Sequence, residues 1–318
     1  MSRVGLVLGG GGVTGAAFHF ASLFALQMAT GWDPDDAEVV IGTSSGAVVA
    51  AMLRGGAFDL ASLVGDADGG REVAEALAAR VYRRARPAGV GRWVRHGLVP
   101  GLRRPGVHIV LGFPAPYTTE GIVEWLEDHL GDGIHEWPGR PTIVVAFELE
   151  GRRRVAFGTN GSPDTGLGSA VAASSAVPMV FQPVEIEGRR YVDGGIASGT
   201  SADLVLGADE PLDLVIVVAP MAAAETRPEA RFYEPVVDRL GHEALAAERE
   251  QISNVWPNTE ILVLQPDVRV LDETRPNPLS THAAVPAFLT TLHSMRRLLA
   301  AADVWPVLAR HLLVPGHR

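Results

Sequence analysis

The hydrophobic pattern of the chain alternates between short apolar runs and longer segments with apolar residues at helical spacing. The run Val4–Leu8 ends at glycines and predicts a strand buried on both faces. Ala16–Ala29 has helical periodicity and no proline, Glu38–Ile41 predicts a second strand, and Gly46–Leu53 begins a second helix. This order of elements requires parallel strands joined by right-handed crossovers.

Later in the chain, two pairs of strand-like runs flank short turns and predict β-hairpins. They are Thr142–Glu148 with Arg154–Gly158, and Val184–Glu187 with Arg189–Val192. Two more apolar runs, Leu214–Val218 and Glu260–Leu264, predict buried strands.

Two long helices are expected near the C-terminus, at Glu234–Asn254 and Ala284–Leu313. Pro286 and Pro306 should shorten or kink the second helix. Periodic signals continue almost to the last residue without a linker, so we expect residues 1–318 to form one α/β domain with a mainly parallel central sheet.

Composition excludes several kinds of chemistry. The chain has no cysteine and no lysine, and it has 27 arginines. Thiolate metal sites, cysteine nucleophiles, Schiff-base lysines and the P-loop lysine are therefore excluded. Because we find neither a signal-peptide pattern nor an apolar run near the ~18 residues of a membrane span, we expect a cytoplasmic protein. A formal net charge of −10 argues against nucleic acid as a partner.

The segment Gly42-Thr43-Ser44-Ser45-Gly46 carries the most specific local motif. It fits G-x-S-x-G between a predicted strand and a predicted helix, which is the context of a nucleophile elbow. Gly42 and Gly46 remove side chains that would collide across the turn, and the following helix directs its N-terminal amides at the reacting oxygen. The alternative is a turn of small residues that only packs a helix on a sheet.

A second glycine motif, Gly9-Gly10-Gly11-Gly12-Val13-Thr14-Gly15, directly follows the first strand. Its exposed backbone N–H groups suit a developing oxyanion. Gly10, Gly12 and Gly15 also fit the dinucleotide fingerprint G-x-G-x-x-G, which needs an acidic residue at the end of the second strand. That strand runs into Ser44 instead, and the nearby acids Asp33, Asp35, Asp36 and Glu38 come at or before its start. The dinucleotide interpretation is therefore weak.

The third motif is Asp193-Gly194-Gly195 after the strand-like segment Arg189–Val192. Alone it would be an ordinary turn. Together with the oxyanion-type glycine loop and the G-x-S-x-G motif, it resembles the patatin-like phospholipase family. The block from Ala173-Ser174-Ser175 to Asp193 also looks like the family's segment around its catalytic aspartate, and the resemblance covers roughly residues 4–220.

The resemblance implies a three-layer α/β/α fold with a variable cap insertion, and a lipid or phospholipid substrate. It implies Ser44 as nucleophile and Asp193 as proton acceptor, with the amides of Gly10, Gly11, Gly12 and Val13 as the oxyanion hole. Gly15, Gly42, Gly46, Gly194 and Gly195 match the motif glycines, and no metal or cofactor is needed. Thr14 departs from the family, which usually has arginine or lysine there, and this puts the substrate preference in doubt.

A Ser-His-Asp triad is an alternative, because His242, His282 and His293 follow Asp193 in the chain. An α/β-hydrolase normally builds several strands before its elbow, whereas here only one strand precedes the strand that runs into Ser44. We expect these histidines on the surface, and His19 packed under the glycine loop. The dyad is the simpler interpretation.

Residues 77–119 hold eight arginines and no acid. The arginines are Arg80, Arg83, Arg84, Arg86, Arg92, Arg95, Arg103 and Arg104. We interpret this basic stretch as a cap or lid insertion that meets anionic lipid headgroups at the inner membrane surface through Arg80–Arg104. An arginine face that pairs with acids of the rest of the chain is an equal alternative.

The sequence thus favours a serine acyl hydrolase that cleaves lipid esters through an acyl-enzyme. A catalytically weak patatin-fold protein that binds lipid or a partner is the main alternative, and a nucleotide-binding oxidoreductase is a distant third.

Overall fold

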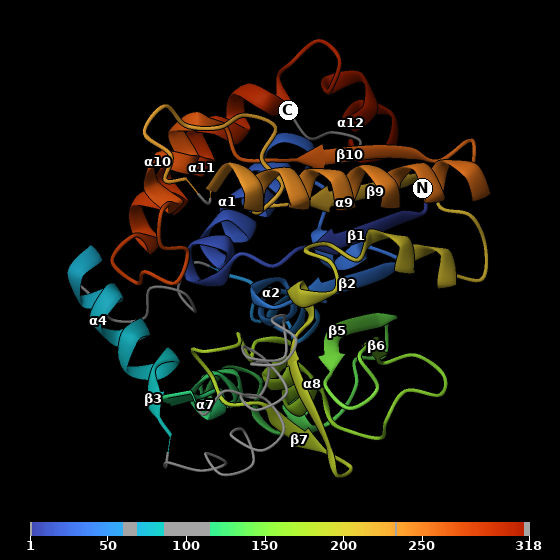
Figure 1. The fold of residues 1–318 in the computed structure, drawn as a ribbon. Helices are drawn as coiled ribbons and strands as arrows, with labels where there is room; N and C mark the ends of the chain where they lie inside the picture. The colour runs from blue at the N-terminus through green and yellow to red at the C-terminus, as the bar shows by residue number, and fades with distance from the viewer. Residues whose placement is uncertain (1, 60–68, 86–114, 233, 315–318) are drawn as a thin grey trace.

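A computed structural model describes residues 2–59, 69–85, 115–232 and 234–314 of the chain (Figure 1). Its central sheet has the strand order β10-β9-β1-β2-β5-β8-β7, and β6 pairs with β5. The strands are β1 (Val4–Leu8), β2 (Val39–Thr43), β5 (Thr142–Glu148), β6 (Arg153–Phe157), β7 (Val184–Ile186), β8 (Arg189–Asp193), β9 (Leu214–Val218) and β10 (Glu260–Leu264). A separate short ribbon joins β3 (Arg83–Arg84) to β4 (Tyr117–Thr118).

The five strands from β10 to β5 are parallel, whereas β6, β7 and β8 add antiparallel pairings. The mainly parallel α/β class expected from the sequence is therefore confirmed. Both predicted hairpins are present as the pairs β5–β6 and β7–β8.

Helices flank the sheet on both faces (Figure 1). They are α1 (Gly12–Thr30), α2 (Ser45–Arg54), α4 (Gly70–Val81), α7 (Glu120–Leu130), α8 (Leu167–Ser174), α9 (Glu234–Val255), α10 (Val268–Thr274), α11 (Ala284–Leu299) and α12 (Trp305–His311). Short 3-10 segments lie at Pro34–Asp36, Gly131–His135, Gly194–Ile196 and Ala202–Gly207.

The parallel strands contribute side chains to two hydrophobic cores, which explains why their apolar residues form continuous runs. In β1, Leu6 and Leu8 pack in the core under α1 and α2, whereas Val7 packs in the core under α9. All three side chains are fully buried. The parallel strands β1 and β2 lie side by side, with Leu8 in register with Gly42, so both glycine motifs begin at the same edge of the sheet.

Two helix predictions were wrong in their bounds. The helix expected from Ala16 begins at Gly12, inside the glycine motif. The helix expected over Ala284–Leu313 is divided into α11 and α12. Neither proline breaks a helix, because Pro286 and Pro306 both lie in first turns, where their missing N–H has no intrahelical acceptor.

Helix α1 is long and apolar enough to cross a membrane by length and composition, contrary to the expectation from apolar runs. Its side chains form part of the core, with Phe18, Leu23 and Leu26 fully buried. Since burial inside the protein accounts for this apolar character, α1 is here a core helix.

Candidate active site

Ser44 lies on the sharp turn between β2 and α2. Its backbone has φ 54° and ψ −122°, a conformation that a residue other than glycine rarely adopts. A Cβ on Gly42 would lie 2.5 Å from the Cα of Ala47, and a Cβ on Gly46 would lie 2.0 Å from the carbonyl oxygen of Leu8. Only glycine fits at either position, so the motif forms the strained turn that an exposed nucleophile requires.

The backbone of this turn is held by Ser174, at the end of α8. The Ser174 hydroxyl accepts a hydrogen bond from Ser44 N–H at 2.8 Å and donates to the carbonyl oxygen of Val145 at 2.5 Å. Ser174 is fully buried. The sequence motifs assigned it no role, although it stands in the block that resembles the family.

Asp193 is the last residue of β8 and lies beside Ser44. Strand β8 pairs with β5, and β5 pairs with β2, so the ends of these strands bring the two residues together. The Ser44 hydroxyl donates a hydrogen bond to the Asp193 carboxylate, and Gly195 N–H donates a second one at 2.7 Å. The two sequence-predicted residues therefore meet.

Burial makes Asp193 a stronger base than a free aspartate. The side chain is in a buried position, which raises the pKa of its carboxyl from 3.8 to about 6, although the hydrogen bonds from Ser44 and Gly195 act in the opposite direction. A carboxylate with this pKa is still ionised at neutral pH. It therefore suits general-base work better than an exposed aspartate does.

The first glycine motif lies against Ser44, as the adjacent strands predict. A Cβ on Gly10 would be 3.3 Å from the Cβ of Ser44. The N–H of Gly10 donates to the carbonyl oxygen of Gly199 at 2.7 Å, so this amide is already occupied. Within the described part of the chain, the amides of Gly11, Gly12 and Val13 have no backbone acceptor. Gly12 and Val13 line the same cavity as Ser44.

Thr14, at the position where the family usually has a basic residue, packs against the segment around Pro278. Its N–H and its hydroxyl both donate to the carbonyl oxygen of Pro278, at 3.0 and 3.3 Å. The side chain is buried at 1% exposure under this C-terminal segment. A neutral hydroxyl, bonded to the Pro278 carbonyl oxygen, thus stands at this position.

The histidines do not complete a triad with Asp193. His242, His282 and His293 are exposed, and the described partners of Asp193 are Ser44 and Gly195. His19 lies under the glycine loop, as expected, where its Nε2–H donates to the Gly9 carbonyl oxygen at 2.6 Å. Burial lowers the pKa of His19 to about 4, so the ring is neutral and fixes the loop rather than moving a proton.

The dinucleotide interpretation lacks its acidic residue. Strand β2 ends at Thr43, directly before Ser44. Asp33, Asp35 and Asp36 lie before this strand, and Asp35 pairs with Arg54 and Arg140. Asp36 also pairs with Arg140, so Asp35 and Asp36 belong to an ion-pair cluster before the strand, whereas the Asp33 carboxylate accepts the N–H of Asp35.

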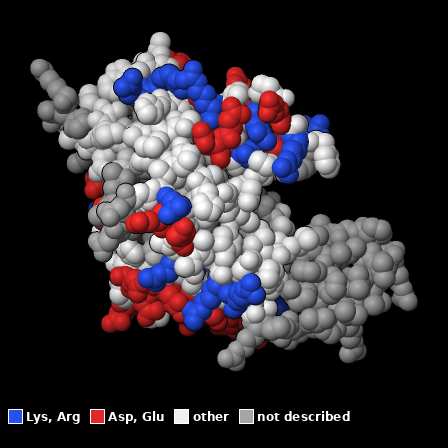
Figure 2. Space-filling view, turned by 90° about the vertical axis from the view of Figure 1, so that its left-hand side faces the viewer, with Lys and Arg blue, Asp and Glu red and all other residues white. Residues whose placement is uncertain are grey.

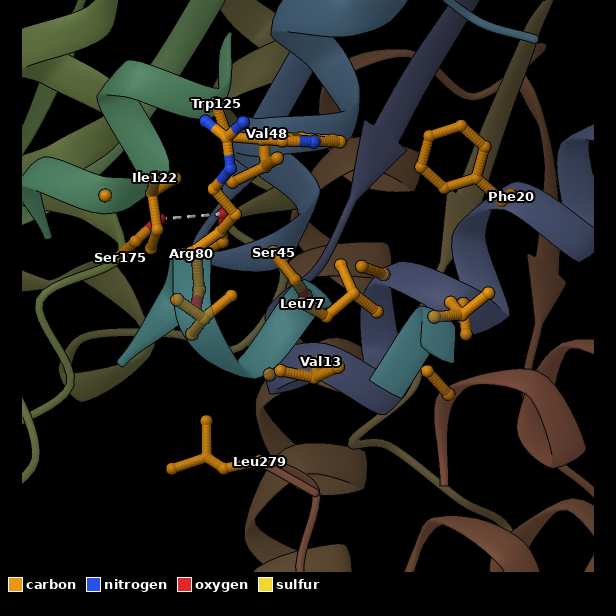
Figure 3. Close-up of a pocket in the computed structure, with 18 of the residues that line it drawn as sticks. Val13, Phe20, Ser45, Val48, Leu77, Arg80, Ile122, Trp125, Ser175 and Leu279 are labelled. Carbon is orange, nitrogen blue, oxygen red and sulfur yellow. Dashed lines mark hydrogen bonds between the residues drawn. The ribbon is translucent and has the colours of Figure 1, made fainter. Parts of the chain in front are cut away.

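A cavity of about 320 Å³ extends from Ser44 between α1, α2, α4, α7 and α11 (Figure 3). Its lining is almost entirely apolar and includes Phe20, Val48, Trp125, Phe181, Leu279 and Phe288. Ser44, Ser45 and Ser175 are the serines of this lining, and Arg80 is the charged residue among the described lining. The arrangement suits a flexible apolar chain with one polar reacting group.

The structure describes residues 77–85 and 115–119 of the basic stretch. Arg80 pairs with Asp128, and Arg83 pairs with Glu124, both acids of α7. These two pairs agree with the alternative in which the arginines neutralise acids of the same chain. Residues 86–114, with Arg86, Arg92, Arg95, Arg103 and Arg104, lie outside the described residues, so the cap insertion remains a prediction.

The face that lies at the left of Figure 1 has its charged side chains mainly towards its edges, while its middle is mostly uncharged (Figure 2). Beside the cavity, Arg80 forms an ion pair with Asp128.

These features define a mainly parallel α/β protein that has a serine on a strained strand-to-helix turn. The hydroxyl of this serine donates a hydrogen bond to a buried aspartate. The sequence model of the patatin-like phospholipase family matches residues 6–206, more than half of the chain. The chain therefore belongs to the patatin-like phospholipase family, a family of lipid acyl hydrolases.

Solved structures of similar proteins include VipD from Legionella pneumophila, with a TM-score of 0.42 and 15% identity over 98% of this chain and 67% of VipD. They also include human GIVD cytosolic phospholipase A2 in complex with methyl gamma-linolenyl fluorophosphonate, with a TM-score of 0.38 and 13% identity. That match covers 98% of this chain, which spans 60% of the human protein.

Proposed function

We propose that this chain hydrolyses lipid acyl esters through an acyl-enzyme formed on Ser44, with Asp193 as the side-chain base. The observation that carries the proposal is the hydrogen bond from the Ser44 hydroxyl to the buried Asp193 carboxylate, at the head of an apolar cavity. The strained backbone at Ser44 supports it independently.

In the first half of the reaction, the Ser44 oxygen attacks the ester carbonyl carbon while Asp193 takes the hydroxyl proton. The carbonyl oxygen becomes an oxyanion, for which the amides of Gly11, Gly12 and Val13 are the candidate donors. The bond to the alcohol oxygen then breaks. Asp193 returns its proton to the departing alcohol, which leaves the acyl group on Ser44.

In the second half, water replaces the alcohol. Asp193 accepts a proton from the water as it attacks the acyl carbon, and the same amides bind the second oxyanion. The bond between the acyl carbon and the Ser44 oxygen breaks, Asp193 returns its proton to that oxygen, and the fatty acid and the free hydroxyl of Ser44 are formed. A pKa of about 6 suits Asp193 to both directions of proton transfer, because it is neither a very weak base nor a very weak acid near neutral pH.

The lining of the cavity indicates which substrates the chain would accept. Its aromatic and aliphatic lining would hold an acyl chain, since burial of apolar surface is favourable and the walls offer few polar partners. We therefore expect esters with an acyl chain long enough to reach Phe20 and Phe288 to be cleaved better than acetyl esters.

An active-site-directed fluorophosphonate tests the function directly, because only an activated serine reacts. Wild-type protein should take up one label per chain and cleave a soluble ester, whereas Ser44→Ala should do neither. Ser45→Ala is the matched control, because Ser45 is also buried and lines the same cavity. Stoichiometric labelling of Ser44→Ala would contradict the assignment. A folded wild-type protein that binds lipid but takes up no label would support the non-catalytic alternative.

We further propose a cytoplasmic location with peripheral contact at an anionic membrane surface through the basic stretch. The arginines of residues 86–104 would carry this contact, because Arg80 and Arg83 already pair with acids of α7. Each free arginine near an anionic surface contributes about 1 kcal/mol of attraction.

A further inference from the structure

The inward face of α9 carries three buried acidic residues, which is unusual for a helix that covers a core. Glu234 pairs with Arg227, and Asp238 pairs with Arg275. Glu248 has different partners. Its Oε1 accepts a hydrogen bond from the Ser198 hydroxyl at 2.5 Å, and its Oε2 accepts bonds from the Thr200 hydroxyl at 2.5 Å and from Ala202 N–H at 2.9 Å.

These three donors belong to the loop that follows the candidate base. After Asp193, the chain makes the 3-10 turn Gly194–Ile196 and enters the segment 198–202. The Ser198 hydroxyl accepts bonds from Thr200 N–H at 3.2 Å and Ser201 N–H at 3.0 Å, which fold the segment around it. Ser201 is fully buried with φ 55°, so the loop holds a strained backbone that needs fixed partners.

The same loop contacts the glycine motif. The carbonyl oxygen of Gly199 accepts the N–H of Gly10 at 2.7 Å, and a Cβ on Gly9 would lie 2.9 Å from that oxygen. Gly10 in turn lies against Ser44. The position of the Gly199 peptide therefore sets the position of the Gly10 peptide, from which the amides of Gly11 and Gly12 continue.

We infer that Glu248 is a positioning residue for the reaction, through which α9 fixes the loop after Asp193 against the glycine loop beside Ser44. The inference rests on the proposed function, and Glu248 lies outside residues 6–206, which match the family. Glu248 touches no reacting atom. It acts through the Ser198–Ala202 segment, because its one carboxylate accepts three hydrogen bonds from this segment.

Glutamine cannot replace the carboxylate. If its NH₂ group faced the Ser198 hydroxyl, that oxygen would have to accept a third bond besides those from Thr200 and Ser201. If the NH₂ group faced the other way, it would meet the N–H of Ala202, and two donors would oppose each other. Either orientation displaces the loop.

Glu248→Gln in the full-length chain, with Glu234→Gln as the matched control, tests the inference. Both are buried acids on one face of one helix, and only Glu248 contacts the loop. We expect Glu248→Gln to lower kcat for a soluble ester roughly 10- to 100-fold, with KM within about twofold, since a misplaced oxyanion loop costs turnover. Fluorophosphonate labelling should slow by a similar factor, and the pH profile should keep its rise near pH 6. Glu234→Gln should lower thermal stability while labelling at the wild-type rate.

A second pair of variants covers the case in which Glu248→Gln does not fold. Ser198→Ala and Thr200→Val remove the donors from the loop side and should each lower kcat in the same direction. Wild-type turnover in Glu248→Gln, or in both loop variants, would overturn the inference while the proposed function stands. Equal losses of kcat in Glu248→Gln and Glu234→Gln would also overturn it. A wild-type chain that neither labels nor cleaves ester would contradict the proposed function and this inference together.

Discussion

Asp193→Asn tests whether the buried carboxylate opposes folding while it serves catalysis. The side chain is 7% exposed, and burial raises the pKa of its carboxyl from 3.8 to about 6. The folded state therefore binds this proton more tightly than the unfolded chain does. Stability from this group is complete below about pH 4 and is lost as the pH rises through about 6. At about 1.4 kcal/mol for each pKa unit, the loss is about 3 kcal/mol.

Asparagine keeps the shape of the side chain and removes the charge. Its amide oxygen can still accept the Gly195 N–H that Asp193 accepts at 2.7 Å. We expect Asp193→Asn to match the wild type near pH 4 and to exceed its free energy of unfolding by up to about 3 kcal/mol near pH 8. Hydrolysis should fall roughly 10²-fold or more, because no base remains for the Ser44 proton. In the wild type, kcat/KM should rise with pH through about 6.

Denaturant unfolding of both proteins at about pH 4, 6 and 8 measures the difference directly. Other carboxylates cancel between the two proteins, so the pH dependence of the difference belongs to Asp193. Ser44→Ala provides a second check, since it removes the hydrogen bond that lowers the pKa of Asp193 and should move the transition to higher pH. A stability difference that does not change between pH 4 and 8, or a less stable Asp193→Asn at pH 8, would refute the reasoning.

Two further predictions concern the turn and the basic stretch. Gly46→Ala would place a Cβ 2.0 Å from the Leu8 carbonyl oxygen, so it should lower the free energy of unfolding by roughly 3 kcal/mol or more and abolish labelling. Gly139→Ala, where no atom lies within 4 Å of the added Cβ, is the control, and a Gly46→Ala variant that melts with the wild type would contradict the geometry. Replacement of Arg92, Arg95, Arg103 and Arg104 by Gln should weaken binding to anionic vesicles by several tens of fold or more, at about 1 kcal/mol each, and leave hydrolysis of a soluble ester nearly unchanged. Cosedimentation at two salt concentrations checks this, and unchanged binding with a lower melting temperature would instead support ion pairing within the chain.

The sequence predicted the strands well because they are buried on both faces. The run Val4–Leu8 is continuous because Leu6 and Val7 face different cores, and no other element accepts such a short, wholly apolar segment as readily. Ser44 and Asp193 could be named because each stands beside glycines that only a close backbone approach explains. At Gly194, for example, a Cβ would lie 2.3 Å from the Val145 carbonyl oxygen.

Contacts between distant segments could not be predicted. Helix α1 begins at Gly12 because Pro278, more than 260 residues away, accepts the N–H of Thr14 in its first turn. Glycine is a poor helix former, so local propensity placed the start at Ala16. The occupied amide of Gly10 was missed for a similar reason, since its acceptor is Gly199.

Burial of the acidic residues of α9 could not be predicted from the local sequence either. Charged residues are rarely buried without a partner, so the sequence of α9 alone does not mark Glu234, Asp238 and Glu248 as buried. All three lie on the inward face, where their partners come from other segments. Burial of a carboxylate is thus decided by the donors that surround it, and those donors are not visible in the local sequence.

Buried residues with a strained backbone occur at the candidate site and in the loop beside it, in the described part of the chain. Residues other than glycine with positive φ are Ser44, Arg152, Met179, Glu187 and Ser201 in the described part of the chain. Arg152, Met179 and Glu187 are exposed, and Arg152 and Glu187 lie in hairpin turns, where such a conformation is common. Ser44 and Ser201 are buried, and their strain persists only because fixed partners hold them. One is the candidate nucleophile and the other ends the loop that Glu248 fixes, so the two positions where the fold holds buried strain are joined through Gly199 and Gly10.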